Sequence, residues 1–572
     1  MTSRYLRLTA VAVCLLSLAA CSVEESAEKS KEPADLILSG GVVHTMDSTV
    51  PRGEAVAIQG GRILAVGSTV DILARYEGPV RDLAGAMVLP GFHDAHVHPI
   101  GAGIDLLRCD LSEARSVEET LAAVAECDKA SPGDDWLLGA GWSLGLFEDA
   151  NPHKSLIDGI VPNRPVLLQG ADGHSSWANS VALAEAGVEA ETVAPPLGVI
   201  ERDPDGTPSG TVRETAQYLL WNAAPEPTEA DREAGLLAAV AVLNSVGVTS
   251  AIGAAVDTRG LALYQRLADE GRLNLRFVAS MGGYGEEGDT LADPASRGTG
   301  ARVRSDAVKI FADGVLEGET AALLEPYLET EGGHMGMLNV APDVLNARVV
   351  DMDRRGIQVH VHAIGDAAVR EALDAFQAAR EANGVTDNRH HIAHLQLIHP
   401  DDYARFAELG VAADFQSVWA FPDEYIVDIN TAQVGQARVD RMYPIGSLER
   451  AGATIVTGSD WNVSTPNPLV AIEVAMTRQD PEGRRTGVLN ADEAVSLDTM
   501  LRAYTVNGAW LMHQENETGR LAAGMKADLV VLEKDLFEVA PADIGEVGIL
   551  ATYLEGELVY DAASTSADAA AP

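Results

Sequence analysis

The stretch that decides the fold is residues 228–256, TEADREAGLLAAVAVLNSVGVTSAIGAAV, which predicts one helix followed by one buried strand. Thr228 and Asp231 have the spacing of a helix cap, and Gly247 is a stop signal. Between them the leucines and valines recur at helical spacing and form one apolar face. The apolar run 248–256 then has the length and composition of a strand covered on both faces. The stretch therefore predicts a crossover helix that leads into a parallel sheet.

Similar apolar runs recur through the chain, most of them followed by a helical stretch. Together with 248–256 they number eight, which predicts an α/β fold, a (β/α)8 TIM-type barrel. The other seven runs are 88–98, 274–281, 307–314, 357–366, 391–398, 411–418 and 453–460. About 150 residues separate the first two runs, whereas one βαβ connection needs only about 30. The excess predicts an inserted subdomain after the first barrel strand, at about 105–225.

The two ends of the chain share a different texture, with short β-rich runs separated by glycines. Neither end is large enough for a core of its own, so we expect residues 34–87 and 515–562 to form one small composite β-sandwich. The barrel then occupies 88–514, and the low-complexity residues 563–572 are expected to be a disordered tail.

The N-terminus has the features of an export signal. Two arginines precede an apolar run of residues 10–20, which is shorter than the roughly 20 residues that span a bilayer. The run ends Leu-Ala-Ala-Cys21, which resembles the bacterial lipobox, so residues 1–21 are expected to be a lipoprotein signal peptide with Cys21 as the lipidated residue. Ordinary cleavage at a small-residue site is the alternative. Residues 22–33 are polar and fit a flexible tether, which predicts an exported protein anchored by lipid to a bacterial membrane, in the periplasm or at the cell surface.

The composition excludes some partners. The 572 residues include 41 Lys and Arg against 85 Asp and Glu, a formal net charge of −44. So acidic a chain is repelled by phosphates, so we expect no nucleic-acid partner. Four cysteines are too few for a disulfide scaffold. In an oxidising compartment Cys109 and Cys127 can pair, and the spacing leaves open whether they do.

Candidate metal ligands lie at or near the C-terminal ends of the predicted barrel strands. His96 and His98 are two residues apart in an extended segment, so both imidazoles point to one face. Each candidate alone also has a structural interpretation, such as a core histidine or a helix cap. Their convergence on the mouth where barrel active sites lie favours a metal site. The further candidates are Lys309, His362, His394 and Asp460.

Seven segments, in this order, resemble the metal-dependent amidohydrolase superfamily, specifically the branch that includes N-substituted formamide deformylase. They are LPGFHDAHVHP (89–99), DGHSSWANSVAL (172–183), VKIFADG (308–314), HVHAIGDAAV (360–369), RHHIAHLQLI (389–398), GSDWNV (458–463) and AGMKADLVVL (523–532). The resemblance covers most of the mature chain.

The resemblance implies a ligand set and roles for individual residues. It makes His96, His98, Lys309, His362, His394 and Asp460 the ligands of one or two divalent ions, most plausibly Zn²⁺, with Lys309 carbamylated. A metal-bound hydroxide would attack the substrate, Asp460 would act as general base and then general acid, and His174 would polarise the substrate.

Three other histidines lie near these motifs. His360 shares the face of His362, and we interpret it as structural because the family pattern selects His362. Strand alternation puts His390 with His394 and turns His391 away. Ala393 stands where related sequences usually carry Glu, which leaves the hydrogen bonding around His394 open.

The expected function is hydrolysis of a carbon–nitrogen bond other than a peptide bond, in a small or peptide-like molecule. Trp177, Gln416 and Trp461 are the expected substrate-binding residues. The alternative is a non-catalytic periplasmic binding lipoprotein on the same scaffold, and isomerisation or decarboxylation is a third option. The expected partners are a small-molecule substrate and the membrane, with a homodimer as one possible assembly.

Overall fold

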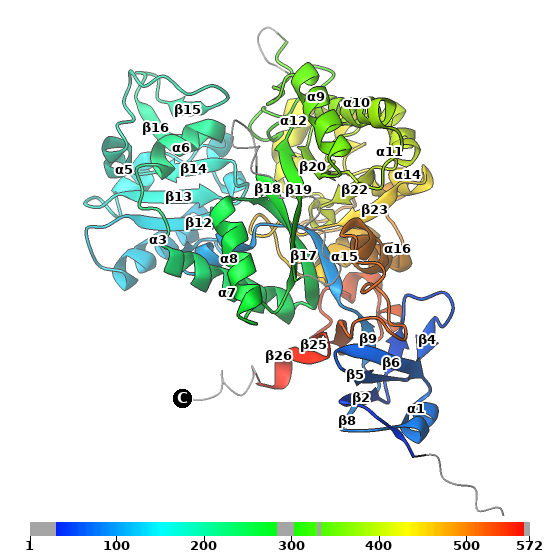
Figure 1. Ribbon diagram of the computed structural model, residues 1–572. Coiled ribbons are helices and arrows are strands. Elements are labelled where there is room, and N and C mark those ends of the chain that lie inside the picture. The colour runs from blue at the N-terminus through cyan, green and yellow to red at the C-terminus, as the bar shows by residue number, and fades with distance from the viewer. Residues whose placement is uncertain (1–29, 283–301, 329–332, 565–572) are drawn as a thin grey trace, which may run out of the picture.

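A computed structural model describes residues 30–282, 302–328 and 333–564 of the chain (Figure 1). The predicted signal peptide, Cys21, most of the tether and the end of the tail lie outside the described residues. The last tether residues are described, and strand β1 (Glu32–Pro33) pairs with β7 (Tyr76–Glu77). No helix within these ranges is both long and apolar enough to cross a membrane.

The centre of the described chain is an eight-stranded, all-parallel sheet whose strands follow one another in sequence order. All eight predicted runs contribute one strand each, so the barrel prediction is confirmed. A bridge between Val97 and Trp461 joins the last strand to the first and closes the ring. The strands are β10 (Phe92–Val97), β17 (Val248–Val256), β18 (Arg276–Gly282), β19 (Val303–Phe311), β20 (Gln358–Ala363), β21 (His391–His394), β22 (Ala412–Phe415) and β23 (Thr454–Thr457).

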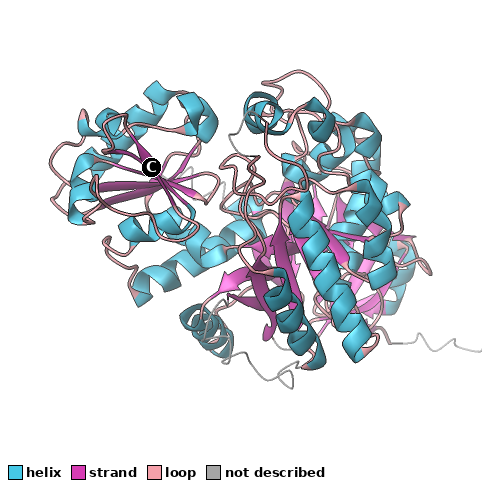
Figure 2. Ribbon diagram, turned by 90° about the horizontal axis from the view of Figure 1, so that it is seen from above, coloured by secondary structure: helices cyan, strands magenta, loops and turns pink. Residues whose placement is uncertain are grey.

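Helices cover the outside of the barrel (Figure 2). Helix α7 (Glu229–Ser245) begins with the predicted capping box of Thr228 and Asp231 and buries Leu236 and Leu243 against the barrel. The other helices around the barrel are α2 (Pro99–Asp105), α8 (Thr258–Asp269), α9 (Pro342–Arg354), α10 (Asp366–Asn383), α11 (Tyr403–Leu409), α12 (Thr431–Val434), α13 (Gln436–Val439), α14 (Ile445–Arg450), α15 (Pro468–Thr477), α16 (Leu497–Arg502) and α17 (Gly508–Leu511).

The barrel interior changes from apolar to polar along its axis. Small apolar side chains from six strands fill its lower end and pack on Leu511 and Met512. Above them the next interior positions carry Lys309, His360 and Asp414, all fully buried. The polar part of the interior thus begins above a mainly apolar plug, in which buried Gln358 donates to the Leu511 carbonyl at 3.0 Å. The six residues of the plug are Ala95, Ile252, Val278, Ala307, Ala412 and Val456.

The inserted subdomain follows α2 and lies beside the barrel (Figures 1 and 2). A disulfide joins Cys109 to Cys127 and so ties β11 to α3. Its six-stranded sheet has the order β11-β12-β13-β14-β16-β15. The elements are β11 (Cys109–Asp110), α3 (Val117–Ala130), β12 (Leu137–Trp142), α4 (Lys154–Asp158), β13 (Val166–Gly170), β14 (Ser175–Ala178), α5 (Ser180–Glu185), β15 (Val199–Arg202), β16 (Pro208–Arg213) and α6 (Gln217–Trp221).

The two chain ends form the predicted β-sandwich, where the blue and red segments meet in Figure 1. Val43, Val88, Leu529 and Val531 pack in one core, so each end supplies part of it. One sheet has the order β6-β5-β2-β8 and the other β26-β25-β24-β9-β3-β4. The elements are β2 (Leu36–Ser39), β3 (Val42–His44), β4 (Arg52–Gly53), β5 (Ala55–Gln59), β6 (Arg62–Gly67), α1 (Thr69–Arg75), β8 (Val80–Asp82), β9 (Met87–Pro90), β24 (Leu529–Leu532), β25 (Ile549–Leu554) and β26 (Glu557–Asp561).

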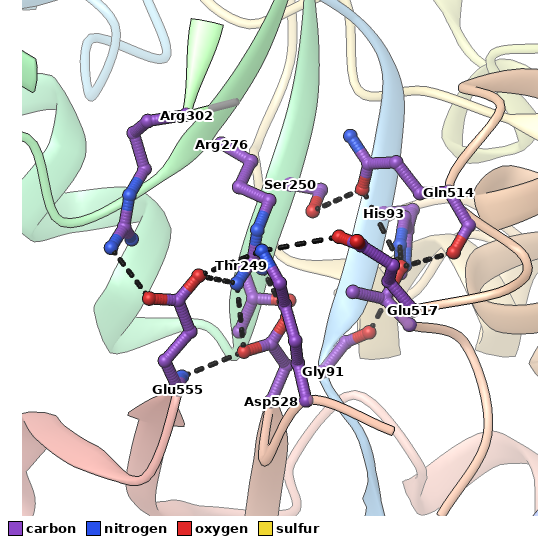
Figure 3. A network of polar contacts seen from close by, with 12 residues as sticks. Gly91, His93, Thr249, Ser250, Arg276, Arg302, Gln514, Glu517, Asp528 and Glu555 are labelled. Atoms are coloured by element: carbon purple, nitrogen blue, oxygen red, sulfur yellow. Dashed lines mark hydrogen bonds and ion pairs between the residues drawn. The ribbon is translucent and has the colours of Figure 1, made fainter. Parts of the chain in front are cut away.

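A buried ionic network joins the sandwich to the bottom of the barrel (Figure 3). Arg276 on β18 binds both Asp528 and Glu555, at 2.5 Å from the Glu555 carboxylate. Glu555 also accepts from Arg302 at 3.0 Å and from Lys526 at 2.9 Å. Because Arg276 and Asp528 are almost fully buried, this network fixes how the two modules sit on each other.

Candidate metal centre

Three predicted ligands converge where the first and last barrel strands meet. His96 is the last residue but one of β10, His98 follows that strand, and Asp460 follows β23. The Asp460 Oδ1 atom lies 3.3 Å from His96 Nε2 and 3.0 Å from His98 Nε2. His96 is fully buried, while the His98 side chain is 29% exposed at the rim. Two imidazole nitrogens and a carboxylate oxygen thus face one point, as metal ligands do.

The backbone around Asp460 explains this convergence. Gly458 lies so close to β10 that a Cβ there would come within 2.4 Å of the backbone nitrogen of His96. Asp460 has a positive φ of 52° and donates its N–H to the His96 carbonyl at 2.7 Å. The buried Asp94 carboxylate accepts from the N–H groups of His96 and Ser459. These contacts hold the Asp460 loop against the strand that carries His96.

Lys309 lies on β19, deep in the barrel and fully buried. Its Nζ is 3.1 Å from His96 Nε2 and 3.4 Å from His360 Nε2. Burial lowers the Lys309 pKa to about 7, although Asp460 and Asp414 act to raise it. A lysine with so low a pKa is partly neutral near pH 7, and a neutral amine is the form that reacts with CO2 to give a carbamate.

His362 and His394 form a second pair at the barrel mouth, with ring centroids 4.4 Å apart. His362 Nε2 lies 3.0 Å from the Gly314 carbonyl, which leaves Nδ1 to face a ligand. His394 Nδ1 lies 3.7 Å from Asp460 Oδ2. Burial, followed by nearby cationic groups, holds the pKa of each of these histidines well below its usual value. Both imidazoles are therefore neutral, as metal ligation requires.

The structure contradicts our strand-alternation argument for residues 390–394. His390 points outward, where it stacks on Phe376 and its Nε2 lies 3.0 Å from Asp353 Oδ1. His391 points into the barrel, with its ring 4.1 Å from that of His360. His394 returns to the interior because its φ is +80°, so the alternation ends there.

His360, interpreted above as structural, lies within the ligand cluster. The His360 Nε2 atom is 3.1 Å from His96 Nδ1, and the Asp414 Oδ2 atom is 3.9 Å from His96 Nδ1. These three residues form a second group whose ligand atoms all lie within 4.8 Å of one another. The sequence reasoning missed Asp414, although the polar ADFQ in an apolar strand is a signal that could have drawn attention to it.

His174 reaches the barrel mouth from the inserted subdomain. Its ring is 5.7 Å from that of His362, and its Nδ1 is 3.0 Å from Glu214 Oε2. Burial lowers the pKa of His174, but the Glu214 carboxylate outweighs it and raises the pKa to about 9. The imidazole is therefore a cation near pH 7. Glu214, also bound by the Thr320 hydroxyl at 2.7 Å, was not predicted, and its local sequence gives no signal of this role.

One cavity of about 1450 Å³ connects these residues to the surface. Its walls come from both the barrel mouth and the inserted subdomain, so the insert closes one side of the site. The apolar part of the wall includes Phe311, Trp419 and Trp221, and Trp419 stacks on His394 at 5.6 Å. Of the predicted ligands, His96, His98, His362, His394 and Asp460 line the cavity.

The predicted substrate-binding residues do not line this cavity. Trp177 is fully buried with Trp142 and Phe147 in the core of the insert. Trp461 is packed in the barrel core beside β10. Gln416 lies fully buried next to His394. The interpretation of Trp177 and Trp461 as pocket residues was wrong, because aromatic residues near a predicted mouth are equally suited to its supporting core.

The donor set fits a divalent cation. Both Asp414 oxygens are buried without a hydrogen-bond partner among the residues that the structure describes, and Asp460 Oδ1 faces the His96 and His98 nitrogens without hydrogen-bond geometry. Unpaired carboxylate oxygens in a protein interior cost several kcal/mol, which a bound cation offsets. Imidazole and carboxylate ligands in this number suit Zn²⁺ and similar ions.

Comparison with known proteins finds relatives over most of the chain. Residues 79–560 match the amidohydrolase family, and residues 55–76 match an imidazolonepropionase-like composite domain of bacteria. YtcJ of Bacillus subtilis is 30% identical over 92% of this chain and 99% of its own. N-substituted formamide deformylase of Arthrobacter pascens is 28% identical over 92% and 98%.

A solved structure shares the fold. An uncharacterized metal-dependent hydrolase from Pyrococcus furiosus superposes with a TM-score of 0.67 at 28% identity, over 87% of this chain and 99% of its own. The family match spans the barrel and the C-terminal part of the composite sandwich. The chain therefore belongs to the amidohydrolase family.

Proposed function

We propose that this protein hydrolyses a carbon–nitrogen bond, other than a peptide bond, in a small or peptide-like molecule. The observation that carries the proposal is the convergence of Asp460, His96 and His98 at the floor of a cavity that the inserted subdomain closes. Family membership supports a metal-dependent hydrolase. The identity of the bond is our inference.

The ion would be held by His96, His98 and Asp460, with His362 and His394 as ligands of a second ion. Lys309 could bridge them after its amine adds CO2, which forms a carbamate and releases a proton. Zn²⁺, when bound, lowers the pKa of water toward about 7 and polarises a carbonyl oxygen. Five of these six side chains line the cavity or its floor, and Lys309 lies directly beneath.

Asp460 is suited to move the proton in this reaction. Its Oδ1 has no hydrogen-bond partner within the described ranges, and it lies at the cavity floor. We infer that it takes a proton from the attacking water and delivers it to the leaving nitrogen. His174, held as a cation by Glu214, would donate a hydrogen bond to the substrate from the opposite wall.

The substrate is expected to carry a sizeable group beside the bond that is cleaved. A cavity of about 1450 Å³ exceeds the usual range of about 300–1,000 Å³ for small-molecule sites. Phe311 and Trp419 beside the histidines fit an apolar substituent on the cleaved group. The relative from Arthrobacter pascens is named for N-substituted formamides, so amides with an apolar N-substituent are the first compounds to assay.

We also propose that the protein is exported and anchored at Cys21. The support is the lipobox-like sequence together with the disulfide between Cys109 and Cys127, because such bonds persist mainly in oxidising compartments. Replacement Cys21→Ser should move the protein from the membrane fraction to the soluble fraction. Recovery of both forms in the membrane fraction would argue against the anchor.

Metal content and turnover together test the function. The full-length protein should carry at least one divalent ion per chain, by elemental mass spectrometry, and hydrolyse N-substituted amides or formamides. Asp460→Asn should reduce turnover by at least about 10³-fold because it removes the proton carrier. Lys309→Ala should lower the metal content.

The alternative is a binding lipoprotein on the same scaffold, which binds small amides without cleaving them. A metal-loaded protein that binds the compounds but releases no amine would favour that alternative. A protein that takes up no metal, even with zinc and bicarbonate, would exclude the hydrolytic mechanism.

A further inference from the structure

Two groups of ligand atoms meet at His96. The outer group consists of His96, His98 and Asp460, and the inner group consists of His96, His360 and Asp414. His96 turns a different nitrogen to each, with Nε2 toward Asp460 and Nδ1 toward His360 and Asp414. The inner group lies below the outer one, inside the barrel and above its apolar plug.

The inner group has the spacing of a metal site. His360 Nε2 and His96 Nδ1 are 3.1 Å apart, and Asp414 Oδ2 is 3.9 Å from His96 Nδ1. Two ligands that each lie about 2.1 Å from a tetrahedral zinc ion are separated by about 3.4 Å. The observed distances bracket this value, so small side-chain movements would complete the site.

The inner group is also incompletely satisfied. His360 and Asp414 are fully buried, and Asp414 has neither oxygen hydrogen-bonded within the part of the chain that is described. The His360 Nδ1 atom likewise has no partner there. The layer of a barrel interior at this height is usually filled by branched apolar side chains. A carboxylate left unpaired in such a layer therefore needs a binding partner.

The inner residues could simply orient His96 as a ligand of the outer group, but that role does not account for all of them. A metal-bound histidine donates its second N–H to one acceptor, and His360 Nε2 at 3.1 Å already provides it. Asp414 is then left over, with unpaired oxygens facing the same nitrogen. An imidazole and a carboxylate on one side of His96 match a ligand set better than a single orienting contact.

We propose that His96, His360 and Asp414 bind a divalent transition-metal ion of the Zn²⁺ class. This ion is separate from those proposed at the outer group and at His362 and His394, which together are called the outer site. When both sites are filled, His96 gives its Nδ1 proton to solvent and lies between the two ions as an imidazolate. The inner site does not depend on which reaction the outer site performs.

Lys309 sets a condition for filling the inner site. Its Nζ lies 3.4 Å from His360 Nε2 and 3.5 Å from His96 Nδ1. An ammonium group at this distance would repel a second cation. Conversion of Lys309 to the carbamate replaces the positive charge by a negative one, so bicarbonate should increase the amount of metal bound at the inner site.

Anomalous diffraction at the zinc edge tests the proposal on the full-length protein loaded with Zn²⁺ and bicarbonate. We expect a peak between His96, His360 and Asp414 in addition to density at the outer site. Asp414→Asn and His360→Gln should each lose this peak and about one ion per chain by elemental mass spectrometry. Ser280→Ala is the matched control, because it also removes a buried, unpaired polar atom from the barrel interior, on β18, which carries no residue of the inner group.

His98→Gln separates this inference from the proposed function, since it weakens the outer site and should leave the inner peak. A filled outer site without an inner peak would overturn the inner site. So would an Asp414→Asn protein that folds, by its thermal transition, and retains the full metal content. If Asp414→Asn does not fold, His360→Gln gives the same comparison.

Discussion

At the scale of single residues, the pairing of His174 with Glu214 gives a pH-dependent prediction. In the metal-free protein the carboxylate raises the His174 pKa to about 9 despite burial. Glu214→Gln removes that charge, so burial should make His174 neutral at pH 7. Because the folded-state pKa of His174 exceeds the unfolded value of about 6.5, protonation of His174 stabilises the folded protein. This contribution is complete below pH 6.5 and is lost as the pH rises through 9.

The stability gap between wild type and Glu214→Gln should therefore be largest near pH 6, at up to about 3 kcal/mol, and should close above pH 9. Urea unfolding at several pH values measures the gap, and nitrogen NMR of the His174 ring reports its charge. Glu201→Gln, which removes a carboxylate bound to Arg213 at 3.2 Å in the same subdomain, should leave the His174 titration unchanged. An unaltered His174 titration in Glu214→Gln would contradict the pairing.

Individual site residues could be predicted only where a motif fixed them. His96, His98, Lys309, His362, His394 and Asp460 converge as the motifs suggested. Parity counted back from His394 turned His391 outward, but His391 faces inward, because the positive φ at His394 ends the alternation there. Glu214 meets His174 only through the fold of the insert, so no local pattern could have revealed it.

At the scale of elements, barrel closure depends on the contact between β23 and β10. A Cβ at Gly458 would lie 2.4 Å from the backbone nitrogen of His96 and 2.7 Å from the His96 Cβ. Gly458→Ala should therefore cost about 1–3 kcal/mol of unfolding free energy and weaken zinc binding, because His96 must move. In Gly101→Ala, a Cβ meets nothing within 4 Å on helix α2, so this control should be neutral or slightly stabilising. Equal zinc affinity in Gly458→Ala and wild type would contradict the argument.

The disulfide between β11 and α3 stabilises the inserted subdomain. It spans 18 residues, and a loop of that length corresponds to about 3 kcal/mol. Cys127→Ser should therefore make the insert the first part to be cleaved by protease, with the barrel zinc content retained. Reductant should have the same effect on wild type and none on the variant. Protease resistance equal to that of wild type would show that the disulfide is dispensable.

Strands and helices were easier to predict than side-chain contacts. Residues 248–256 form β17 with the bounds expected from the apolar run, and Thr228 caps α7 as predicted. Burial on both faces makes parallel strands nearly continuous apolar runs, which one sequence reveals. The composite sandwich was predictable because each chain end alone is too small for a core. Its register was not, since cross-strand pairing between distant segments leaves no local signal.

At the scale of the whole molecule, Arg276 links the barrel to the sandwich. Arg276→Leu leaves Asp528 and Glu555 without their shared buried cation, which should cost about 3–5 kcal/mol. The sandwich should then unfold before the barrel, so calorimetry should show two transitions in place of one. Arg302→Leu removes one partly exposed contact with Glu555 at 3.0 Å and should have a smaller effect.

The same network predicts how the whole protein responds to acid. Burial raises the Glu555 pKa, but Arg276 and Lys526 outweigh it and lower the pKa to about 2. A depressed carboxyl pKa stabilises the fold above the unfolded value of about 4.5, and this contribution is lost as pH falls toward 2. The free energy of unfolding of wild type, measured with urea, should therefore fall steeply as the pH drops from 4.5 to 2. Arg276→Leu should show a shallower decline over that window, because Glu555 then titrates nearer its unfolded value. Parallel curves for the two proteins would mean that other carboxylates dominate acid unfolding.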